Sequence, residues 1–432
     1  MTTEVDIFQS PAYKRSRIAY RWECTFEYFV ALLVSDAFLA SLLSSIGISD
    51  AVTGIISSFI TLAFLFQIFS IFIARKISNI KRFVVIVHSV SQLMFMALYI
   101  VPFMPFAFEY KQIAVIICVL AAYFGNYLVT SMIYKWGNSY VDPHKRGSYS
   151  AGKEMLSLFT GMIVTLIIGQ VMDYFEAIDN LEGGFIFAAI SIFIFTTCDF
   201  ICLMLIKNSI RPREEIKKKV PLKNVLKATL GNKSFISLIL LTCIWDMGRY
   251  ATIGFLGTYR IKELFFTVGT VQIINIAANL GRFAVSKPFG IYSDKRSFAK
   301  GAELGFIIIA SAFAVNIFTA PGTRLLMIVY TVLFNVGIAG VNQNLFNMTY
   351  SYVDSEFFVE ASAIRNSIGG LCGFAMSLLA SKLLEAVQAN GNTLFGITVY
   401  GQQILSLISF VLIVIAILLT HFVIRKQKVM IQ

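Results

Sequence analysis

Twelve long apolar stretches, separated by short polar loops, constrain the fold of this 432-residue chain more than any other feature. A helix of about 20 apolar residues has the length needed to cross the hydrocarbon layer of a bilayer. Only 14% of the residues are charged and 57% are hydrophobic, which leaves too few polar side chains to cover a water-exposed surface. We therefore expect an all-α integral membrane protein. The predicted spans are residues 26–46, 51–73, 83–103, 112–133, 149–171, 184–206, 235–257, 268–291, 301–318, 325–349, 366–384 and 398–422.

The predicted spans fall into two groups of six, and the two halves share a weak internal repeat. We expect residues 1–206 to form an N-terminal six-helix bundle, residues 207–233 a basic cytoplasmic linker, and residues 234–432 a C-terminal six-helix bundle. At one constant spacing, short matches link the loop after the fourth span to the loop after the tenth. Two parallel halves of this kind indicate a duplication. The matches are Tyr140-Val141-Asp142 with Tyr352-Val353-Asp354, Lys153 with Arg365, and Gly161 with Gly373.

Positively charged residues set the expected orientation. Most of the 36 Lys and Arg residues lie in the N-terminal segment, the even-numbered loops and the C-terminus. Basic residues favour the cytoplasmic side, so both termini should be cytoplasmic in a multi-pass protein of the plasma membrane. The net charge of +12 then reflects topology and does not indicate a nucleic-acid partner. The basic linker is expected to lie along the anionic inner leaflet.

The loop that ends the eighth predicted span carries a recognisable motif. Gly290 is followed by Asp294-Lys295-Arg296, which resembles the second Gly-x-x-x-Asp-Arg/Lys signature of the major facilitator superfamily. The first copy, around Arg75 and Lys76, keeps the basic residues but lacks both the Gly and the Asp. The resemblance is to uncharacterised bacterial members. It implies two six-helix bundles that rock around a central site, in a monomer.

Charged residues near the cytoplasmic loops predict a gate between the halves. The resemblance implies that Asp294 reaches the start of the fifth span, where Lys153 and the helix N-terminus favour a carboxylate. Asp354 would pair in a similar way with Arg75 and Lys76, although solvated loop charges would explain the same pattern. The predicted gate residues are Asp294, Lys153, Arg75, Lys76, Asp354 and Arg365.

Four ionisable residues lie near the middle of predicted spans: Asp36, Asp246, Arg249 and Arg282. An unpaired charge that faces lipid costs about 2.5 to 3.5 kcal/mol, so these side chains should face protein or a water-filled cavity. Asp246 and Arg249 are three residues apart, share a helix face and can pair directly. Two interpretations stay open. The four form structural ion pairs, or they bind substrate and couple protons, with protonation of Asp246 releasing Arg249.

Polar and aromatic side chains on several spans predict a cavity. In the family that this chain resembles, the first, fourth, seventh and tenth spans line the central cavity. The eighth span here carries a polar stripe as well. A single amide often serves only as an interhelical hydrogen bond worth about 0.6 kcal/mol, but together the residues predict a polar lining. They are Asn126, Tyr127, Trp245, Tyr250, Asn275, Asn279, Asn335 and Asn342.

The sequence shows no pattern for a cofactor, a metal or catalysis. The six cysteines lie in or beside apolar stretches without paired spacings, and His88, His144 and His421 are scattered. No segment resembles a phosphate-binding loop, and no convincing nucleophile and base are present. We therefore expect no metal, no cofactor and no enzymatic activity.

These features predict a secondary active transporter that moves a small organic solute by alternating access, as a symporter or antiporter coupled to protons. Amides and aromatic rings favour a sugar, a glycoside or a nucleoside. Carriage of an organic anion by Arg249 and Arg282 is an alternative, as is efflux of a drug or cation. A non-transporting membrane receptor and a membrane-embedded enzyme are the alternatives from other classes.

Overall fold

The computed structural model describes residues 9–69, 73, 77, 79–141, 146–207, 231–353, 358–394 and 396–427. Within these ranges eleven helices are long and apolar enough to cross a membrane, and a bent helix pair supplies a twelfth span if it is counted as one. The predicted all-α membrane fold is therefore confirmed. The described residues also include a short antiparallel hairpin of β1 (Thr393–Leu394) and β2 (Ile397–Thr398).

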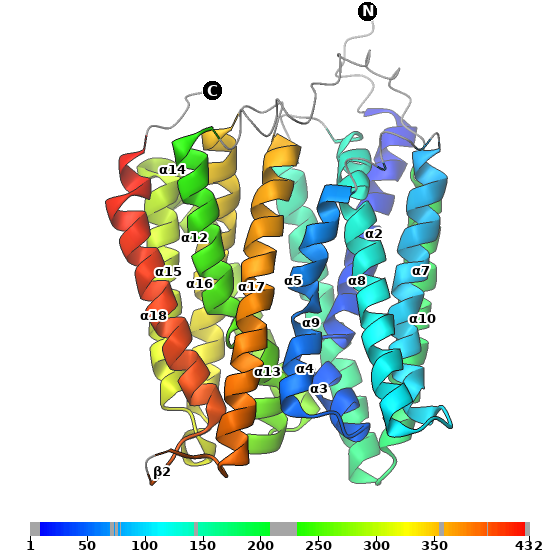
Figure 1. Ribbon diagram of the computed structural model, residues 1–432. Coiled ribbons are helices and arrows are strands. Elements are labelled where there is room, and N and C mark those ends of the chain that lie inside the picture. The colour runs from blue at the N-terminus through cyan, green and yellow to red at the C-terminus, as the bar shows by residue number, and fades with distance from the viewer. Residues whose placement is uncertain are drawn as a thin grey trace, which may run out of the picture. The chain divides into compact units, whose positions relative to one another are not determined.

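The first compact unit comprises Met1–Gly47 and Phe69–Lys219. Its described helices are α2 (Pro11–Leu33), α3 (Asp36–Ser45), α7 (Ile80–Ile100), the 3-10 turn η2 (Val101–Phe103), α8 (Phe108–Asn138), α9 (Arg146–Ala177) and α10 (Leu181–Leu205). Tyr20, Val84, Val129 and Leu203 come from four of these helices and pack together in one buried cluster. This packing fixes α2, α7 and α10 against one another (Figure 1).

The second compact unit comprises Ile48–Ile68 and Val220–Gln432. It therefore includes residues 51–68 of the second predicted span, which was expected to lie in the bundle of residues 1–206. The predicted domain boundaries stay a prediction. The described elements are α4 (Asp50–Ser57), α5 (Phe59–Ala63), η1 (Phe64–Phe66), α12 (Lys233–Tyr250), α13 (Ile253–Thr258), η4 (Tyr259–Glu263), α14 (Val268–Arg296), α15 (Phe298–Ile317), η5 (Pro321–Thr323), α16 (Leu326–Tyr352), α17 (Phe358–Ala389), α18 (Gly401–Phe422) and η7 (Ile424–Lys426).

Helix α10 illustrates why these segments form helices in lipid. Its exposed side chains include Ile186, Ile190 and Phe193, whereas Ala188 and Ile192 on the other face are fully buried. Apolar residues cover both faces, as expected for a helix with protein on one side and hydrocarbon on the other. The Asn180 side chain accepts a hydrogen bond from the backbone N–H of Gly183, which satisfies one donor at the helix start.

The first predicted span is broken rather than continuous. Residues 26–46 were expected to form one helix, but α2 ends at Leu33 and α3 begins at Asp36, with a bend of 44° between them. Ser35 donates its hydroxyl hydrogen to the backbone oxygen of Leu32. Asp36 has φ of 49°, in the left-handed region that Asp tolerates better than most residues. The hydrogen bond of the Ser35 hydroxyl and the left-handed backbone of Asp36 therefore interrupt the backbone hydrogen bonds of the helix at this position.

The seventh predicted span lies within one candidate membrane span, Lys233–Glu263, whose helix is irregular after Tyr250. Helix α12 ends at Tyr250, α13 follows from Ile253, and Tyr259–Glu263 forms a π-helical turn. The turn carries the buried Arg260, whose Nη2 donates to the Thr331 hydroxyl oxygen on α16 at 2.9 Å. Widened turns of this type alter the direction of side chains and often occur at functional positions.

Helices α15 and α16 approach closely because glycines lie at their contact. A Cβ added to Gly305 would lie 2.9 Å from the backbone nitrogen of Val341 and 3.0 Å from the backbone oxygen of Gly337. A Cβ at Gly337 would likewise lie 2.9 Å from the backbone oxygen of Gly305. Small residues at membrane helix contacts allow such backbone packing, which stabilises the pair through dispersion.

We predict that Gly305→Val lowers the stability of the detergent-solubilised protein by about 1 to 3 kcal/mol, because the larger side chain must push two backbones apart. Gly322→Val is the matched control, since a Cβ at Gly322 would meet no described atom within 4 Å. The measurement is thermal unfolding of both variants. An equal melting temperature for Gly305→Val and wild type would show that the α15–α16 contact adapts freely.

Candidate functional site

The buried carboxylate of Asp246 lies at the centre of the candidate site in the second unit. Its helix, α12, starts at Lys233 after Asn232, whose side-chain oxygen accepts hydrogen bonds from the backbone nitrogens of Ser234 and Phe235. Asp246 is 9% exposed and faces α17. A Cβ at Gly369 of α17 would lie 2.4 Å from Asp246 Oδ2, so the missing side chain at Gly369 leaves room for the carboxylate.

Two arginines act electrostatically on the Asp246 carboxylate: Arg249 and Arg365. Arg365 lies on α17 and is 8% exposed. Its Nη1 donates to the backbone oxygen of Leu345 at 2.7 Å and to the Thr349 hydroxyl at 2.5 Å, both on α16. Arg365 was expected to belong to the cytoplasmic gate, but its side chain is buried among helices, in the electrostatic field of Asp246. One carboxylate thus interacts with two guanidinium groups.

Aromatic rings lie beside the guanidinium group of Arg249. The Arg249 guanidinium carbon lies 5.0 Å from the ring centre of Tyr250 and 5.9 Å from that of Trp245. Both rings are almost fully buried, and Trp245 also makes an edge contact with Phe306 on α15. Cations are attracted to the faces of such rings, so Arg249 is held by the aromatic side chains as well as by Asp246. Asp246, Arg249, Trp245 and Tyr250 therefore lie close together, and their part in a substrate site stays a prediction.

The other two predicted midplane charges lie in different settings. Asp36 is half-buried at the break between α2 and α3, in the first unit. Arg282 is half-buried on α14, and its backbone oxygen accepts a hydrogen bond from the Ser286 hydroxyl. Their part in a substrate site stays a prediction.

The predicted lining amides are also spread over several helices. Asn275 and Asn279 are half-buried on α14, and Asn335 on α16 donates to the backbone oxygen of Thr331 at 2.9 Å. Asn342 is exposed. Asn335 thus makes the structural hydrogen bond that the alternative interpretation allowed.

In the first unit, Asn126 and Tyr127 lie half-buried on α8. The Asn126 side-chain oxygen has no hydrogen-bond partner among the described residues, and Tyr127 packs near Tyr123 with ring centres 6.4 Å apart. An unpaired amide oxygen next to aromatic rings is consistent with the polar lining that the sequence predicts.

The predicted gate residues are only partly described. Asp294 is exposed near the end of α14, whereas Arg75, Lys76 and Asp354 lie outside the described residues. Lys153 lies on α9, and its ammonium group contacts Cys24 Sγ at 3.2 Å and the Tyr20 ring at 4.7 Å. The gate itself stays a prediction.

The internal repeat reappears in three dimensions. In the first unit Lys153 of α9 contacts Cys24 of α2, and a Cβ at Gly161 would lie 2.7 Å from Tyr28. In the second unit Arg365 of α17 acts on Asp246 of α12, and a Cβ at Gly373 would lie 2.8 Å from Tyr250. In each half, a cation and a glycine on one helix therefore contact the first helix of that half: α9 contacts α2, and α17 contacts α12. A duplication predicts such equivalent contacts.

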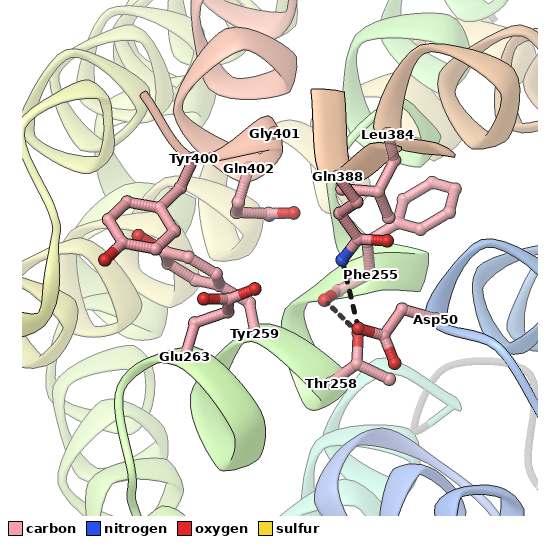
Figure 2. Close-up of a pocket in the computed structure, with 10 residues that line it drawn as sticks. All are labelled: Asp50, Phe255, Thr258, Tyr259, Glu263, Leu384, Gln388, Tyr400, Gly401 and Gln402. Carbon is pink, nitrogen blue, oxygen red and sulfur yellow. Dashed lines mark hydrogen bonds between the residues drawn. The ribbon is translucent and has the colours of Figure 1, made fainter. Parts of the chain in front are cut away.

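A small pocket lies in the second unit, near the start of α4. Figure 2 shows Asp50 and Gln388 turned toward each other, and Gln388 Nε2 donates to Asp50 Oδ2 at 3.1 Å. Asp50 Oδ1 also forms an ion pair with Lys262 Nζ at 2.5 Å. The lining residues are Asp50, Phe255, Thr258, Tyr259, Glu263, Leu384, Gln388, Tyr400, Gly401 and Gln402.

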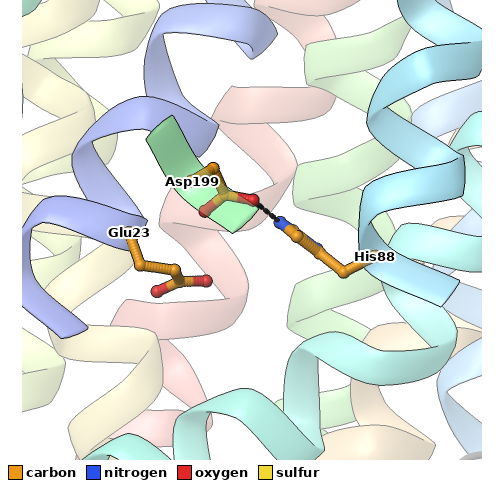
Figure 3. Close-up of side chains that lie close together, drawn as sticks. All are labelled: Glu23, His88 and Asp199. Atoms are coloured by element: carbon orange, nitrogen blue, oxygen red, sulfur yellow. Dashed lines mark ion pairs between the residues drawn. The ribbon is translucent and has the colours of Figure 1, made fainter. Parts of the chain in front are cut away.

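Sequence reasoning missed one group of buried ionisable residues. Glu23, His88 and Asp199 meet inside the first unit (Figure 3). They come from α2, α7 and α10, so no spacing in the sequence connects them. The available signal was that Glu23, His88 and Asp199 all stand in or beside apolar segments, where ionisable residues are costly.

Comparisons with known proteins identify the class. The sequence profile of the Major Facilitator Superfamily matches residues 24–377. A mutant of the nucleoside transporter NupG has a TM-score of 0.71 at 11% identity, over 94% of this chain and 99% of that one. A bacterial homolog of the human lysosomal transporter Spinster has a TM-score of 0.68 at 14% identity, over 96% and 98%. The peptide transporter POT, as a mutant in complex with alafosfalin, has a TM-score of 0.66 at 13% identity, over 96% and 95%. No curated protein sequence matches the chain.

The membrane-spanning helices and the profile match identify a multi-pass helical membrane transporter. Identities of 11 to 14% to the solved structures show a shared fold alone. The profile match covers most of the sequence, and the chain belongs to the major facilitator superfamily.

Proposed function

We propose that this protein is a proton-coupled secondary transporter that carries a small polar organic solute by alternating access. The observation that carries the proposal is the Asp246 carboxylate, buried on α12 between Arg249 and Arg365. From the distribution of basic residues we also propose a plasma-membrane protein with cytoplasmic termini. Membership of the family supports a monomer.

The charge balance at Asp246 supports coupling. When Asp246 is ionised, it offsets one of the two arginines that act on it. When it is protonated, both guanidinium groups lose their counter-charge and can donate hydrogen bonds to a solute. Binding of a proton and binding of the solute are then linked, because each changes the electrostatic cost of the other. In this scheme Asp36 and Arg282 supply further charges to the central cavity.

The aromatic and amide side chains indicate the substrate class. Trp245 and Tyr250 present ring faces beside Arg249, and half-buried amides such as Asn275 offer donors and acceptors. Rings and amides together suit a sugar, a glycoside or a nucleoside, and the NupG structures share the fold. The excess of arginine over acid at Asp246 favours an organic anion as the second candidate.

An ion pair near the start of α4 supports a gate that opens and closes. Asp50 pairs with Lys262, and the Ser381 hydroxyl donates to the backbone oxygen of Ala51 at 3.0 Å. The sequence places Asp50 in a loop without basic residues, on the expected outer side. Lys262 is 36% exposed, and pairs of this type contribute about 0 to 1 kcal/mol. We propose that this contact, the outer latch (Asp50, Lys262 and Gln388), breaks and reforms in each cycle.

For Asp246→Asn we expect loss of proton-driven accumulation. A gradient of one pH unit supports about tenfold accumulation per proton, and a variant that cannot bind the proton should reach only equal concentrations. Solute counterflow should persist, because exchange needs no net proton movement. Proteoliposome flux measures both, with the exposed Glu109→Gln as the control variant. Accumulation by Asp246→Asn equal to that of wild type would exclude this carboxylate as the coupling group.

A ligand panel tests the substrate class by thermal shift. A ligand at 100 times its Kd stabilises the native state by about 2.7 kcal/mol, so the correct class should raise the melting temperature by several degrees. We expect nucleosides or sugars to stabilise wild type, and Arg249→Ala to weaken the effect. Stabilisation by organic anions alone would replace the solute class with the second candidate. Stabilisation by lipophilic cations alone would contradict both.

Disruption of the outer latch should expose the pocket beside it. In Asp50→Asn and in Lys262→Gln, a cysteine introduced at the buried Thr258 should react faster with an impermeant thiol reagent added from outside. The exchanged pair Asp50→Lys with Lys262→Asp should restore slow labelling, because the attraction is restored. The same variants without the Thr258 substitution control for native cysteines. Equal labelling rates in all latch variants would show that the ion pair does not hold the closed state.

A further inference from the structure

Three ionisable side chains converge in the interior of the first unit. Glu23 of α2, His88 of α7 and Asp199 of α10 are each 0% exposed. One potential ligand atom from each residue lies within 4.8 Å of the others. Figure 3 shows the two carboxylates and the imidazole ring turned toward a common space. The three helices therefore bring a nitrogen and two oxygen ligands together from positions that are far apart in the sequence.

Several polar atoms of this cluster lack the hydrogen bonds that burial requires. His88 Nε2 and Asp199 Oδ2 form an ion pair at 2.9 Å. Within the described part of the chain, Glu23 Oε1, Asp199 Oδ1 and His88 Nδ1 have no hydrogen-bond partner. Glu23 Oε2 accepts a hydrogen bond from Cys24 Sγ at 3.1 Å. Unsatisfied buried polar atoms cost about 1 to 3 kcal/mol each, so something should bind them.

A divalent cation would also balance the charge of this group. Two ionised carboxylates and a neutral imidazole carry two negative charges. Without a metal ion, the group is neutral only when His88 and one of the two carboxyl groups are both protonated. A divalent ion bound to a neutral imidazole would neutralise both carboxylates, which removes the main cost of placing them inside a membrane helix bundle.

The ligand types select the ion. One nitrogen and two carboxylate oxygens suit zinc and similar divalent transition metals, whereas calcium and magnesium prefer oxygen ligands alone. Gln92 lies one turn beyond His88 on α7, is 1% exposed, and neither of its amide atoms has a hydrogen-bond partner among the described residues. Because residues four apart lie on the same face of a helix, Gln92 is the candidate for a fourth ligand or for a supporting hydrogen bond.

We propose that Glu23, His88 and Asp199 bind one divalent transition-metal ion of the zinc type, which links α2, α7 and α10. The ligands are fully buried inside one unit, so the ion is held as part of the structure and is not transported. Its binding energy becomes folding energy of the first unit, because the site exists only when the three helices are packed.

The test begins with the metal content of the full-length protein. After exposure to zinc and removal of free ion, elemental analysis should find about one ion per chain. His88→Gln and Asp199→Asn should each reduce this value by about tenfold or more, as loss of a ligand does. His421→Gln is the matched control, because His421 is exposed and pairs with Glu303 elsewhere. Equal zinc content in wild type and in both ligand variants would overturn the proposal.

Two further measurements do not depend on whether the variants fold. Cobalt added to wild-type protein should give visible absorption bands typical of a bound ion with nitrogen and oxygen ligands, and zinc should remove them. A chelator should lower the melting temperature of wild type by at least about 4 °C, and zinc should restore it. Wild-type protein that shows neither cobalt bands nor a response to the chelator would contradict the site, whatever its transport activity.

Discussion

The constraint on which this structure depends is that lipid offers no partner to a polar group. Backbone hydrogen bonds must close within helices, and every charged side chain must meet its partner inside protein. The exposed face of α10 consists of large apolar side chains, whereas the fully buried Asp199 lies on its inner face. The few ionisable residues in the spans therefore cannot be distributed freely, and they gather in clusters inside the protein.

Two such clusters stand out among the described residues, one in each unit, and they differ in how their charges are balanced. At Asp246 a single acid interacts with Arg249 and Arg365, so a solute group or a change of protonation can alter the balance. At Glu23, His88 and Asp199 the acids outnumber the available cations, and all three side chains are closed off from solvent. An excess of positive charge suits transient binding of a solute, while a fully enclosed excess of negative charge suits a permanent ion.

Much of the fold could be predicted from the sequence, because a stretch of about 20 apolar residues has only one stable form in lipid. The bend after Leu33 and the irregular backbone after Tyr250 were not predicted. Both depend on local hydrogen bonds and on packing, and a hydropathy pattern contains no information on either. Asp246, Arg249, Trp245 and Tyr250 were found together because one helix carries all four. The Glu23 cluster and the inward position of Arg365 were missed, since they arise from contacts between separate helices.

The repeat explains why both clusters involve the first helix of a half. Lys153 and Arg365 occupy matching positions in the two halves. Lys153 contacts Cys24 on α2, and Arg365 interacts with Asp246 on α12. In the second half the residue opposite the cation is an acid, so the pair responds to protonation. In the first half the residue opposite the cation is the thiol of Cys24. The acid is the preceding residue, Glu23, whose side chain lies near His88 and Asp199. A shift of one residue along a helix rotates a side chain by about 100°, enough to transfer a carboxylate from one helix interface to another. Two copies of one ancestral bundle could thus acquire separate roles, one for coupling and one for structure.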